Sequence, residues 1–298
     1  MIPNTRRQSI DPRPAVLVIG AGGGIGRAVI AALAGRNFRV FGTFREPSEQ
    51  RDLVDPLDFA DSADTDMLAP GATPVRMDLT DAQSIRTGLE VVSAELDGAP
   101  LAGLVNAAGV SGLCPLAQLP LAEMRHVLEV NLVGPIAVCQ ASLPLLKASR
   151  GRIVNISSVS ARAALPYLGA YGASKAALEA ASDSLRQELR PFGVDVIVVR
   201  PGAVRTGMAA RLPPEPPPGA DAHDAATARA VANVRRALLA GAAHGVAPEA
   251  VAEAVLRALT DPRPPACITV AAHSWRIRLM SLLPARRREA RAARWIWR

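Results

Sequence analysis

A glycine-rich segment follows the first apolar run of this chain and limits the folds open to it. Five of the seven residues from Gly20 to Gly26 are glycine, directly after the apolar residues 15–19. Because glycine has no Cβ, such a segment permits a tight turn and lets the backbone approach a bound group closely. A helical pattern follows, and the free N–H groups at a helix start favour a negative charge such as a diphosphate. The sequence therefore predicts a buried strand, a turn and a helix that form part of a dinucleotide site.

Apolar runs alternate with helical stretches along the rest of the chain. The sequence predicts a strand over 194–199, an edge strand over 267–271, and helices over 84–96, 121–146, 170–189 and 248–259. Such alternation is typical of an α/β fold, a three-layer doubly wound parallel sheet of the Rossmann type. A chain of 298 residues with 49% hydrophobic content can bury this core as a single domain. We place the domain at 12–272 and a basic tail at 273–298, and leave the segment 46–73 unassigned.

Three side chains have the spacing that carbonyl and alcohol redox chemistry requires. Tyr171 and Lys175 are four residues apart, and residues so spaced share one face of a helix. The Lys175 ammonium would lower the pKa of Tyr171 from its usual value of about 10 and make the phenol a proton donor near neutral pH. Ser158, thirteen residues before Tyr171, follows a strand-like run, so its hydroxyl can polarise a substrate carbonyl at the carboxyl end of that strand.

Each of these residues also has a simpler interpretation. A tyrosine and a lysine four apart on an exposed helix commonly only pack or face solvent, and the preceding nucleotide motif is what favours catalysis. Ser157 and Ser160 lie beside Ser158, and only the offset from Tyr171 selects Ser158. We expect Ser157 to face the opposite side of its strand.

Taken together, these residues resemble the short-chain dehydrogenase/reductase family from residue 15 to about 206, and the run 165–206 is most similar to its steroid and retinol dehydrogenase branch. The resemblance implies that Ser158, Tyr171 and Lys175 are catalytic and that Asn131 holds a water in a proton relay. It implies cofactor contacts at Tyr171, Lys175, Gly20, Gly24, Ile25, Gly26, Asp78, Leu79, Asn106, Ala107, Gly109, Pro201, Gly202, Val204 and Thr206. Of these, Asp78 would contact the adenine and Thr206 would lie near the nicotinamide carboxamide.

Two positions depart from the family pattern. Ile19 stands where a threonine usually precedes the glycine loop, and Ala107 replaces the second asparagine of the family's NNAG segment at 106–109. We therefore expect the hydrogen bonds around the adenine and the central strand to be arranged differently.

The end of the second predicted strand indicates the cofactor. Residues 38–45 end at Arg45, and no acid stands where an Asp or Glu would bind the ribose 2′-hydroxyl. A guanidinium matches the geometry of a 2′-phosphate, which favours NADP(H) over NAD(H). In the alternative interpretation Arg45 is a solvated loop residue and Glu46 binds the ribose.

The inferred reaction transfers a hydride between the nicotinamide and a carbonyl carbon, while Tyr171 moves the proton separately. No metal is expected, because His126, His223, His244 and His273 lack the spacing of a metal site.

Apolar residues in the loops 110–119 and 159–170 favour a small hydrophobic carbonyl or alcohol substrate, although they could equally pack these loops against the core. A third loop, 205–245, contains a proline-rich stretch that would be a lid edge or a solvated spacer.

Cysteine usage and hydropathy bear on location. Three scattered cysteines, Cys114, Cys139 and Cys267, do not form a disulfide framework and suit a reducing compartment. The first fourteen residues have no apolar core of a signal peptide, and no segment offers eighteen unbroken apolar residues. We therefore expect a cytoplasmic protein.

The net charge of +7 lies entirely in the tail. Residues 275–298 contain eight arginines and one glutamate, which gives +7 and leaves zero for the preceding 274 residues. All three tryptophans, Trp275, Trp295 and Trp297, lie there too, and basic residues with tryptophans suit weak contact with an anionic membrane surface. A solvated extension or a segment that docks on another subunit is the favoured interpretation. Nucleic-acid binding is not expected, because the charge is confined to one short segment.

A different functional class also fits the fold. Some related proteins bind a dinucleotide as non-catalytic sensors or scaffold subunits, but these typically lack one of the three catalytic residues that this chain keeps. The resemblance further implies a homodimer or homotetramer through the two long helices, over 121–146 and 170–189.

Overall fold

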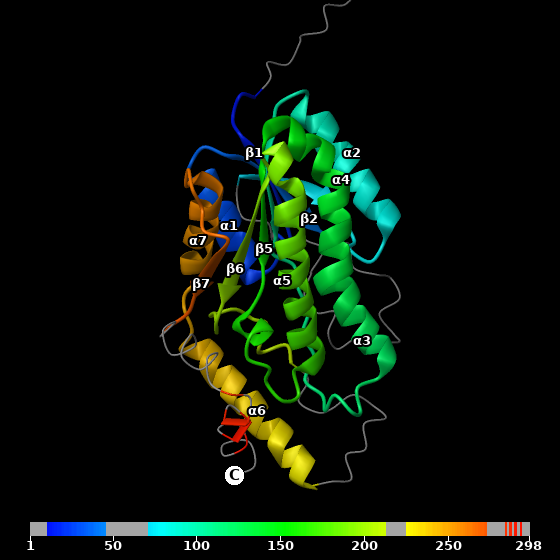
Figure 1. Ribbon diagram of the computed structural model, residues 1–298, viewed down its shortest axis with the longest axis vertical. Coiled ribbons are helices and arrows are strands. Elements are labelled where there is room, and N and C mark those ends of the chain that lie inside the picture. The colour runs from blue at the N-terminus through cyan, green and yellow to red at the C-terminus, as the bar shows by residue number, and fades with distance from the viewer. Residues whose placement is uncertain are drawn as a thin grey trace, which may run out of the picture.

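The protein is built around a parallel sheet of seven strands in the order β3-β2-β1-β4-β5-β6-β7 (Figure 1). This computed structural model describes residues 11–45, 71–212 and 225–272, with a few further positions between 284 and 293. The strands are β1 (Ala15–Ile19), β2 (Arg39–Phe44), β3 (Ala72–Arg76), β4 (Leu101–Asn106), β5 (Arg152–Ile156), β6 (Asp195–Pro201) and β7 (Cys267–Val270). The predicted Rossmann-type α/β fold is confirmed, and β7 is the edge strand expected there.

The central strand β1 shows why this sequence forms a sheet covered on both faces. All five of its residues are buried. Ala15, Leu17 and Ile19 belong to one hydrophobic core cluster, whereas Val16 and Val18 belong to the other. Successive side chains of a strand point to opposite faces, so a continuous apolar run is required when helices cover both. The strand order reverses between β1 and β4, and such a switch point leaves a crevice at the carboxyl ends of the strands.

Helices cover the two faces as the periodicity predicts. α1 (Gly24–Ala34) and α7 (Pro248–Thr260) pack on the face of Val16 and Val18. α2 (Ala82–Leu96), α4 (Gly134–Ser149) and α5 (Gly169–Leu189) pack on the other. The α2, α5 and α7 bounds fall within two residues of the predicted ones.

The helix expected over 121–146 is continuous but irregular. It consists of α3 (Leu121–Leu128), a π-helical turn η2 (Glu129–Val133) and α4. The Gly134 amide donates to the Glu129 carbonyl, five residues back, and Pro135 has no N–H to donate to the carbonyl of Asn131. The turn contains Asn131, which is fully buried.

The same stretch, Leu121–Ser149, is the one helix among the described residues that is long and apolar enough to cross a membrane. About two fifths of its most apolar window, 39%, is buried. Val138, Cys139 and Leu146 point into the core beside the sheet. This packing is that of a core helix, so its apolar composition has a structural explanation.

A helix that sequence analysis missed lies below the carboxyl ends of the strands (Figure 1). α6 (Ala225–Ala243) falls within 205–245, where the sequence predicts a loop. Its many alanines favour a helix, and Ala230, Val231 and Val234 bury one face of it. They pack on Leu113, Leu168 and Leu212, so the three variable loops form a small apolar cluster of their own.

Several predictions concern residues outside the described part of the chain. These include most of the segment 46–73, the proline-rich stretch after Leu212, His223, His273, and nearly all of the tail 273–298 with its tryptophans. The described residues 71–73 belong to β3 or the turn before it.

Candidate active site

The glycine loop joins β1 to α1 in a conformation that other residues could not adopt. Gly20 has a φ of +81°, and a Cβ there would lie 2.7 Å from the backbone of Ala108. A Cβ on Gly26 would collide with the carbonyl oxygen of Gly20, and one on Gly24 would lie 2.8 Å from the Thr206 methyl group. The loop is therefore enclosed by the segments after β4 and β6, with the first amides of α1 left for a ligand.

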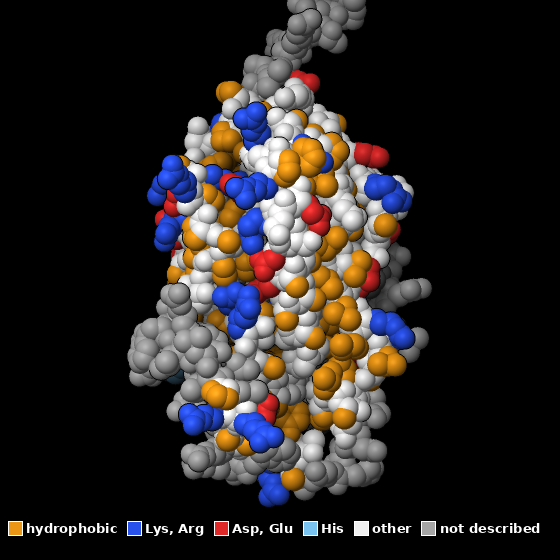
Figure 2. All heavy atoms as spheres, in the orientation of Figure 1, with side chains coloured by type: hydrophobic (Ala, Val, Ile, Leu, Met, Phe, Trp, Pro, Cys, Tyr) orange, Lys and Arg blue, Asp and Glu red, His pale blue; other side chains and the backbone are white. Residues whose placement is uncertain are grey.

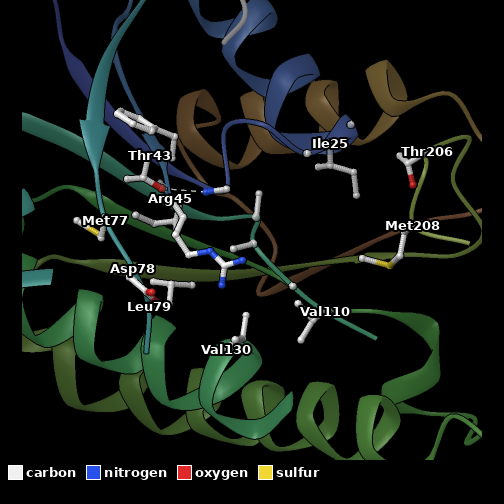
Figure 3. A pocket seen from close by; sticks show the side chains of 18 of the residues that line it. Ile25, Thr43, Arg45, Met77, Asp78, Leu79, Val110, Val130, Thr206 and Met208 are labelled. Atoms are coloured by element: carbon white, nitrogen blue, oxygen red, sulfur yellow. Dashed lines mark hydrogen bonds between the residues drawn. The ribbon is translucent and has the colours of Figure 1, made fainter. Parts of the chain in front are cut away.

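A neighbouring strand compensates for the missing threonine at position 19. Thr43 on β2 is buried, and its hydroxyl accepts a hydrogen bond of 3.1 Å from the Gly20 amide (Figure 3). On the other side, the Ala107 amide donates to the Ile19 carbonyl at 3.0 Å. Thr43, which the motif comparison did not indicate, thus supplies a side-chain partner for the glycine loop.

A cavity extends from the end of β2 past the glycine loop to the segment after β6. The predicted cofactor residues that line it are Gly20, Gly24, Ile25, Arg45, Asp78, Leu79, Ala107, Gly109 and Thr206. It is also lined by residues that sequence analysis missed, among them Thr43, His126, Met208 and Arg211. Only Arg211 carried a usable signal, as a cation five residues after Thr206 on the same loop.

Two charged residues mark one end of this cavity. Figure 3 shows the Arg45 side chain reaching from the end of β2 into the cavity, between Asp78 and Val130. The Asp78 carboxylate accepts hydrogen bonds from the Thr80 amide at 2.8 Å and the Thr80 hydroxyl at 2.7 Å. These bonds fix the turn after β3, so Asp78 holds the cavity wall in place.

Seven predicted cofactor residues do not line the cavity: Tyr171 and Lys175, which are described below, and Gly26, Asn106, Pro201, Gly202 and Val204. Asn106 is buried, and its amide donates to the Asn155 side chain at 2.8 Å, which links β4 to β5. Pro201 ends β6, Gly202 donates to the Val270 carbonyl, and Val204 forms a bridge with Val246. Gly26 is packed against Gly20. These residues support the cavity and do not line it.

Ser158, Tyr171 and Lys175, the Ser-Tyr-Lys group, come together where β5 meets α5. Ser158 is the second residue after β5, and its hydroxyl lies near enough to that of Tyr171 to act on the pKa of the phenol. The Lys175 ammonium donates to the Ile156 carbonyl at 3.0 Å and lies 6.0 Å from the Tyr171 ring centre. Ser158 also accepts from the Ser160 amide at 3.1 Å, which fixes its side chain.

The predicted lowering of the Tyr171 pKa is wrong for this structure. Burial raises the pKa of Tyr171, and only the hydrogen bond from Ser158 opposes that shift. Burial also lowers the pKa of Lys175 to about 8. The ammonium donates to the Ile156 carbonyl, and desolvation of the phenol is the larger cause of the Tyr171 shift. The phenol is therefore protonated at neutral pH and is ready to donate a proton.

Asn131 connects the loop after β4 to α5. Its side-chain oxygen accepts from the Val110 amide and its nitrogen donates to the Val110 carbonyl, both at 2.8 Å. The nitrogen also donates to the Ser174 hydroxyl at 3.0 Å. Asn131 thus holds the Gly109 segment beside the helix that carries Tyr171 and Lys175.

The expectation that Ser157 faces the opposite side of its strand from Ser158 is wrong. Its hydroxyl donates to the Glu179 carboxylate of α5 at 2.8 Å. β5 ends at Ile156, so strict alternation no longer applies at Ser157. Both serines therefore contact the same helix.

Comparisons with known proteins agree with this geometry. The family model for short chain dehydrogenase matches residues 14–217. The chain is similar to short-chain dehydrogenase ptmH of Penicillium ochrochloron, with 39% identity over 207 residues, 68% of this chain and 71% of that protein. It is similar to retinol dehydrogenase 5 of Mus musculus, with 38% identity over 202 residues, 67% of this chain and 60% of that protein. The match thus spans three fifths of the length of the retinol dehydrogenase.

Solved structures share the architecture over nearly the whole chain. A short-chain dehydrogenase from Streptomyces avermitilis has a TM-score of 0.70 and 27% identity, and the match covers 95% of this chain and 96% of that one. One from Burkholderia cenocepacia J2315, solved in complex with NADP, has a TM-score of 0.68 and 24% identity, with 94% and 97% covered. From the matching family model, the glycine loop and the fold, this chain belongs to the short-chain dehydrogenase/reductase family of oxidoreductases.

Proposed function

We propose that this protein interconverts a hydrophobic ketone or aldehyde and its alcohol with NADP(H), and that Tyr171 is the general acid and base. The observation that carries the proposal is the meeting of Ser158, Tyr171 and Lys175 at the carboxyl end of β5, where the Lys175 ammonium lies against Gly109 of the cavity wall. NADP(H), when bound, supplies or accepts the hydride, and the protein has to bind, orient and protonate.

The cavity residues fit a phosphorylated dinucleotide. The first N–H groups of α1 point to where a diphosphate would lie, and a Cβ at Gly24 would fill the space before Thr206. Arg45 projects into the cavity at the end of β2, where it would hold a 2′-phosphate. The solved relative from Burkholderia cenocepacia is itself a complex with NADP, in line with this choice.

The proton is supplied by a neutral phenol. In the reductive direction the hydroxyls of Ser158 and Tyr171 would donate hydrogen bonds to the carbonyl oxygen, and Tyr171 would then pass its proton to the developing alkoxide. The raised pKa of Tyr171 keeps this proton in place at neutral pH. Lys175 would hold the ribose hydroxyls, and its charge would favour the phenolate left behind.

A hydrophobic substrate is supported by the relatives rather than by the loop leucines. Leu113 and Leu168 are buried against α6, so their apolar character is explained by packing. Similar proteins include retinol dehydrogenase 5 and 17-beta-hydroxysteroid dehydrogenase type 6, whose names denote large apolar alcohols. Met208 is exposed and lines the cavity, where it would contact such a substrate.

Oligomer and location complete the proposal. The two long helices would form a homodimer or homotetramer, and Figure 2 shows hydrophobic side chains gathered over the face that carries α3, α4 and α5. Exposed Leu121 and Val133 lie on this helical stretch.

A cytoplasmic location is in keeping with Cys114 and Cys139, which are buried free thiols. The tail 273–298 would be a solvated extension or a docking segment.

The proposal is tested by following NADPH oxidation with a panel of steroid, retinoid, aryl and aliphatic carbonyls. Tyr171→Phe should lower kcat by about 10²- to 10⁴-fold, because the proton donor is lost while the ring keeps its packing. Tyr167→Phe is the matched control, since Tyr167 is the only other tyrosine and packs against α6. Equal turnover by parent and Tyr171→Phe would rule the proposal out. So would a parent enzyme that reduces none of the carbonyls in the panel.

A further inference from the structure

Three consecutive residues at the end of β5 contact three successive turns of α5. Ser158 is joined to Tyr171 on the first turn, and the Ile156 carbonyl accepts from Lys175 on the second. Ser157, between them, donates to Glu179 on the third. Tyr171, Lys175 and Glu179 are spaced four apart and so share one face of the helix. The third contact has no role in the chemistry proposed above.

Glu179 is the centre of a buried charged cluster that joins three segments. Arg200 of β6 donates to it through two nitrogens, Nε at 2.8 Å and Nη2 at 2.7 Å. Arg162, just after Ser158, donates to it at 2.9 Å, and Ser157 completes the set at 2.8 Å. Its side chain is 6% exposed, and that of Arg200 is 15% exposed. Both carboxylate oxygens are therefore fully occupied.

The cluster holds its charges at neutral pH. Burial by itself opposes ionisation of Glu179, but hydrogen bonds from Arg200 and Ser157 and the two guanidinium charges outweigh it and lower its pKa. The hydrogen bond to Glu179 also raises the pKa of Arg200. A two-pronged arginine-carboxylate pair fixes direction as well as distance.

Sliding or rotation of α5 along its own axis would move Tyr171 and Glu179 together, because both lie on one rigid helix. Glu179 lies one turn beyond Lys175, and its contacts with Ser157 and Arg200 prevent that movement. The distance between the Tyr171 and Ser158 hydroxyls therefore depends on a cluster two turns away. A misplacement of about 1 Å at such a site can cost about a hundredfold in rate.

We propose that Glu179, held by Arg200 and Ser157, is a positioning residue that sets the register of α5 and so aligns Tyr171 with Ser158 for proton transfer. The inference rests on the proposed carbonyl reductase function. Glu179 touches neither substrate nor cofactor, so it acts on kcat and leaves cofactor binding alone.

The test separates alignment from folding. Glu179→Gln leaves Arg200 without its counter-charge, and should lower both kcat and the melting temperature. The double variant Glu179→Met with Arg200→Met removes both charges and keeps side-chain volume, a replacement that is often neutral for stability. Ser157→Ala removes only the hydrogen bond from Ser157, because both arginines still hold Glu179. Glu188→Gln is the matched control, since Glu188 lies exposed on the same helix and, within the described ranges, accepts a hydrogen bond only from Ser184.

We expect the double variant to have the same melting temperature as the parent. Its kcat should still be lower than that of the parent by about tenfold or more, with the KM for NADPH unchanged. Ser157→Ala should lower kcat by about three- to tenfold and leave the melting temperature unchanged. Parental kcat in either of these folded variants would overturn the inference, as would a rise in KM for NADPH that accounts for the whole loss. A parent enzyme without turnover on any carbonyl would instead overturn the proposed function.

Discussion

At the scale of single residues, burial acts on the two ionisable groups of the Ser-Tyr-Lys group in opposite senses. It raises the pKa of Tyr171 and lowers the pKa of Lys175 to about 8, so each group is moved toward its neutral form. The motif Tyr-x-x-x-Lys describes spacing, but the charge states depend on how deeply the sheet and loops enclose the pair.

Lys175 should therefore cost the folded protein stability at neutral pH. Its folded pKa of about 8 lies below the usual lysine pKa of 10.5, so the unfolded chain binds this proton more tightly. Lys175→Met should raise the free energy of unfolding at pH 7 by about 1–2 kcal/mol, after allowance for the lost bond to Ile156. The gain should be complete below pH 8 and shrink as the pH rises toward 10.5.

Urea unfolding of the cofactor-free protein at pH 7 and pH 10 measures this effect. Lys147→Met is the control, because Lys147 is the only other lysine and lies over the Phe192 ring near the surface. A gain that is as large at pH 10 as at pH 7 would contradict the assigned cause.

Two arginines of the cavity should differ in what they recognise. Arg45→Gln should weaken NADPH binding by about tenfold or more and leave NADH binding unchanged, because only NADPH carries the 2′-phosphate. Arg211 lines the cavity with Gly20 and Gly24, so Arg211→Gln should weaken NADPH and NADH binding by the same factor through the diphosphate.

Fluorescence titration with both cofactors measures these constants. Arg205→Gln is a matched loss of charge on the same loop, at a residue that binds the Gly245 carbonyl and does not line the cavity. If Arg45→Gln weakened NADPH and NADH binding by the same factor, the alternative interpretation, in which Glu46 binds the ribose, would be favoured.

At the scale of elements, α6 behaves as a separate layer over the loops. Its buried residues contact Leu113, Leu168 and Leu212, and belong to neither of the two core clusters beside the sheet. Elements with few contacts to the main core open locally at lower cost than the whole domain unfolds. The arrangement of the loops after β4, β5 and β6, which would surround the substrate, therefore depends on this small cluster.

Val234→Ala should loosen this layer without unfolding the sheet. Val234 is 1% exposed, and its truncation should cost about 2 kcal/mol locally. We expect faster amide hydrogen exchange in α6 and a higher KM for the carbonyl, with no change in exchange of the β1 amides. Val91→Ala, at an exposed valine of α2, supplies the control. Parental exchange in α6 would show that the cluster does not hold the helix down.

At the scale of the whole molecule, the stretch from α3 to α4 leaves large apolar side chains in solvent. Val133 is 45% exposed and Leu121 is 68% exposed, beside a helix whose inner face is buried in the core. If two chains associate here, Val133→Glu should shift the mass found by light scattering toward the single-chain value of 31.2 kDa. Val91→Glu, at a valine 44% exposed on α2, should leave the assembly intact. Dissociation by both variants alike would remove the assignment of this face.

Local features of the sequence determined much of this molecule. The apolar run before Gly20 fixed a buried strand, the glycines fixed the turn, and the four-residue spacing placed Tyr171 and Lys175 on one helix face. These properties depend on neighbours along the chain, because turn geometry and helical or strand periodicity are short-range. That is why the bounds of α2, α5 and α7 and the cavity-lining glycines were predictable.

Only the tertiary structure decided the features that depend on distant partners. It brought Thr43 from β2 to the Gly20 amide, joined Arg200 of β6 to Glu179 of α5, and gave α6 its binding surface on the loops. It also reversed the expected shift of the Tyr171 pKa. Burial and long-range pairing exist only once the strands are ordered and the helices packed, so no local pattern in the chain carries them.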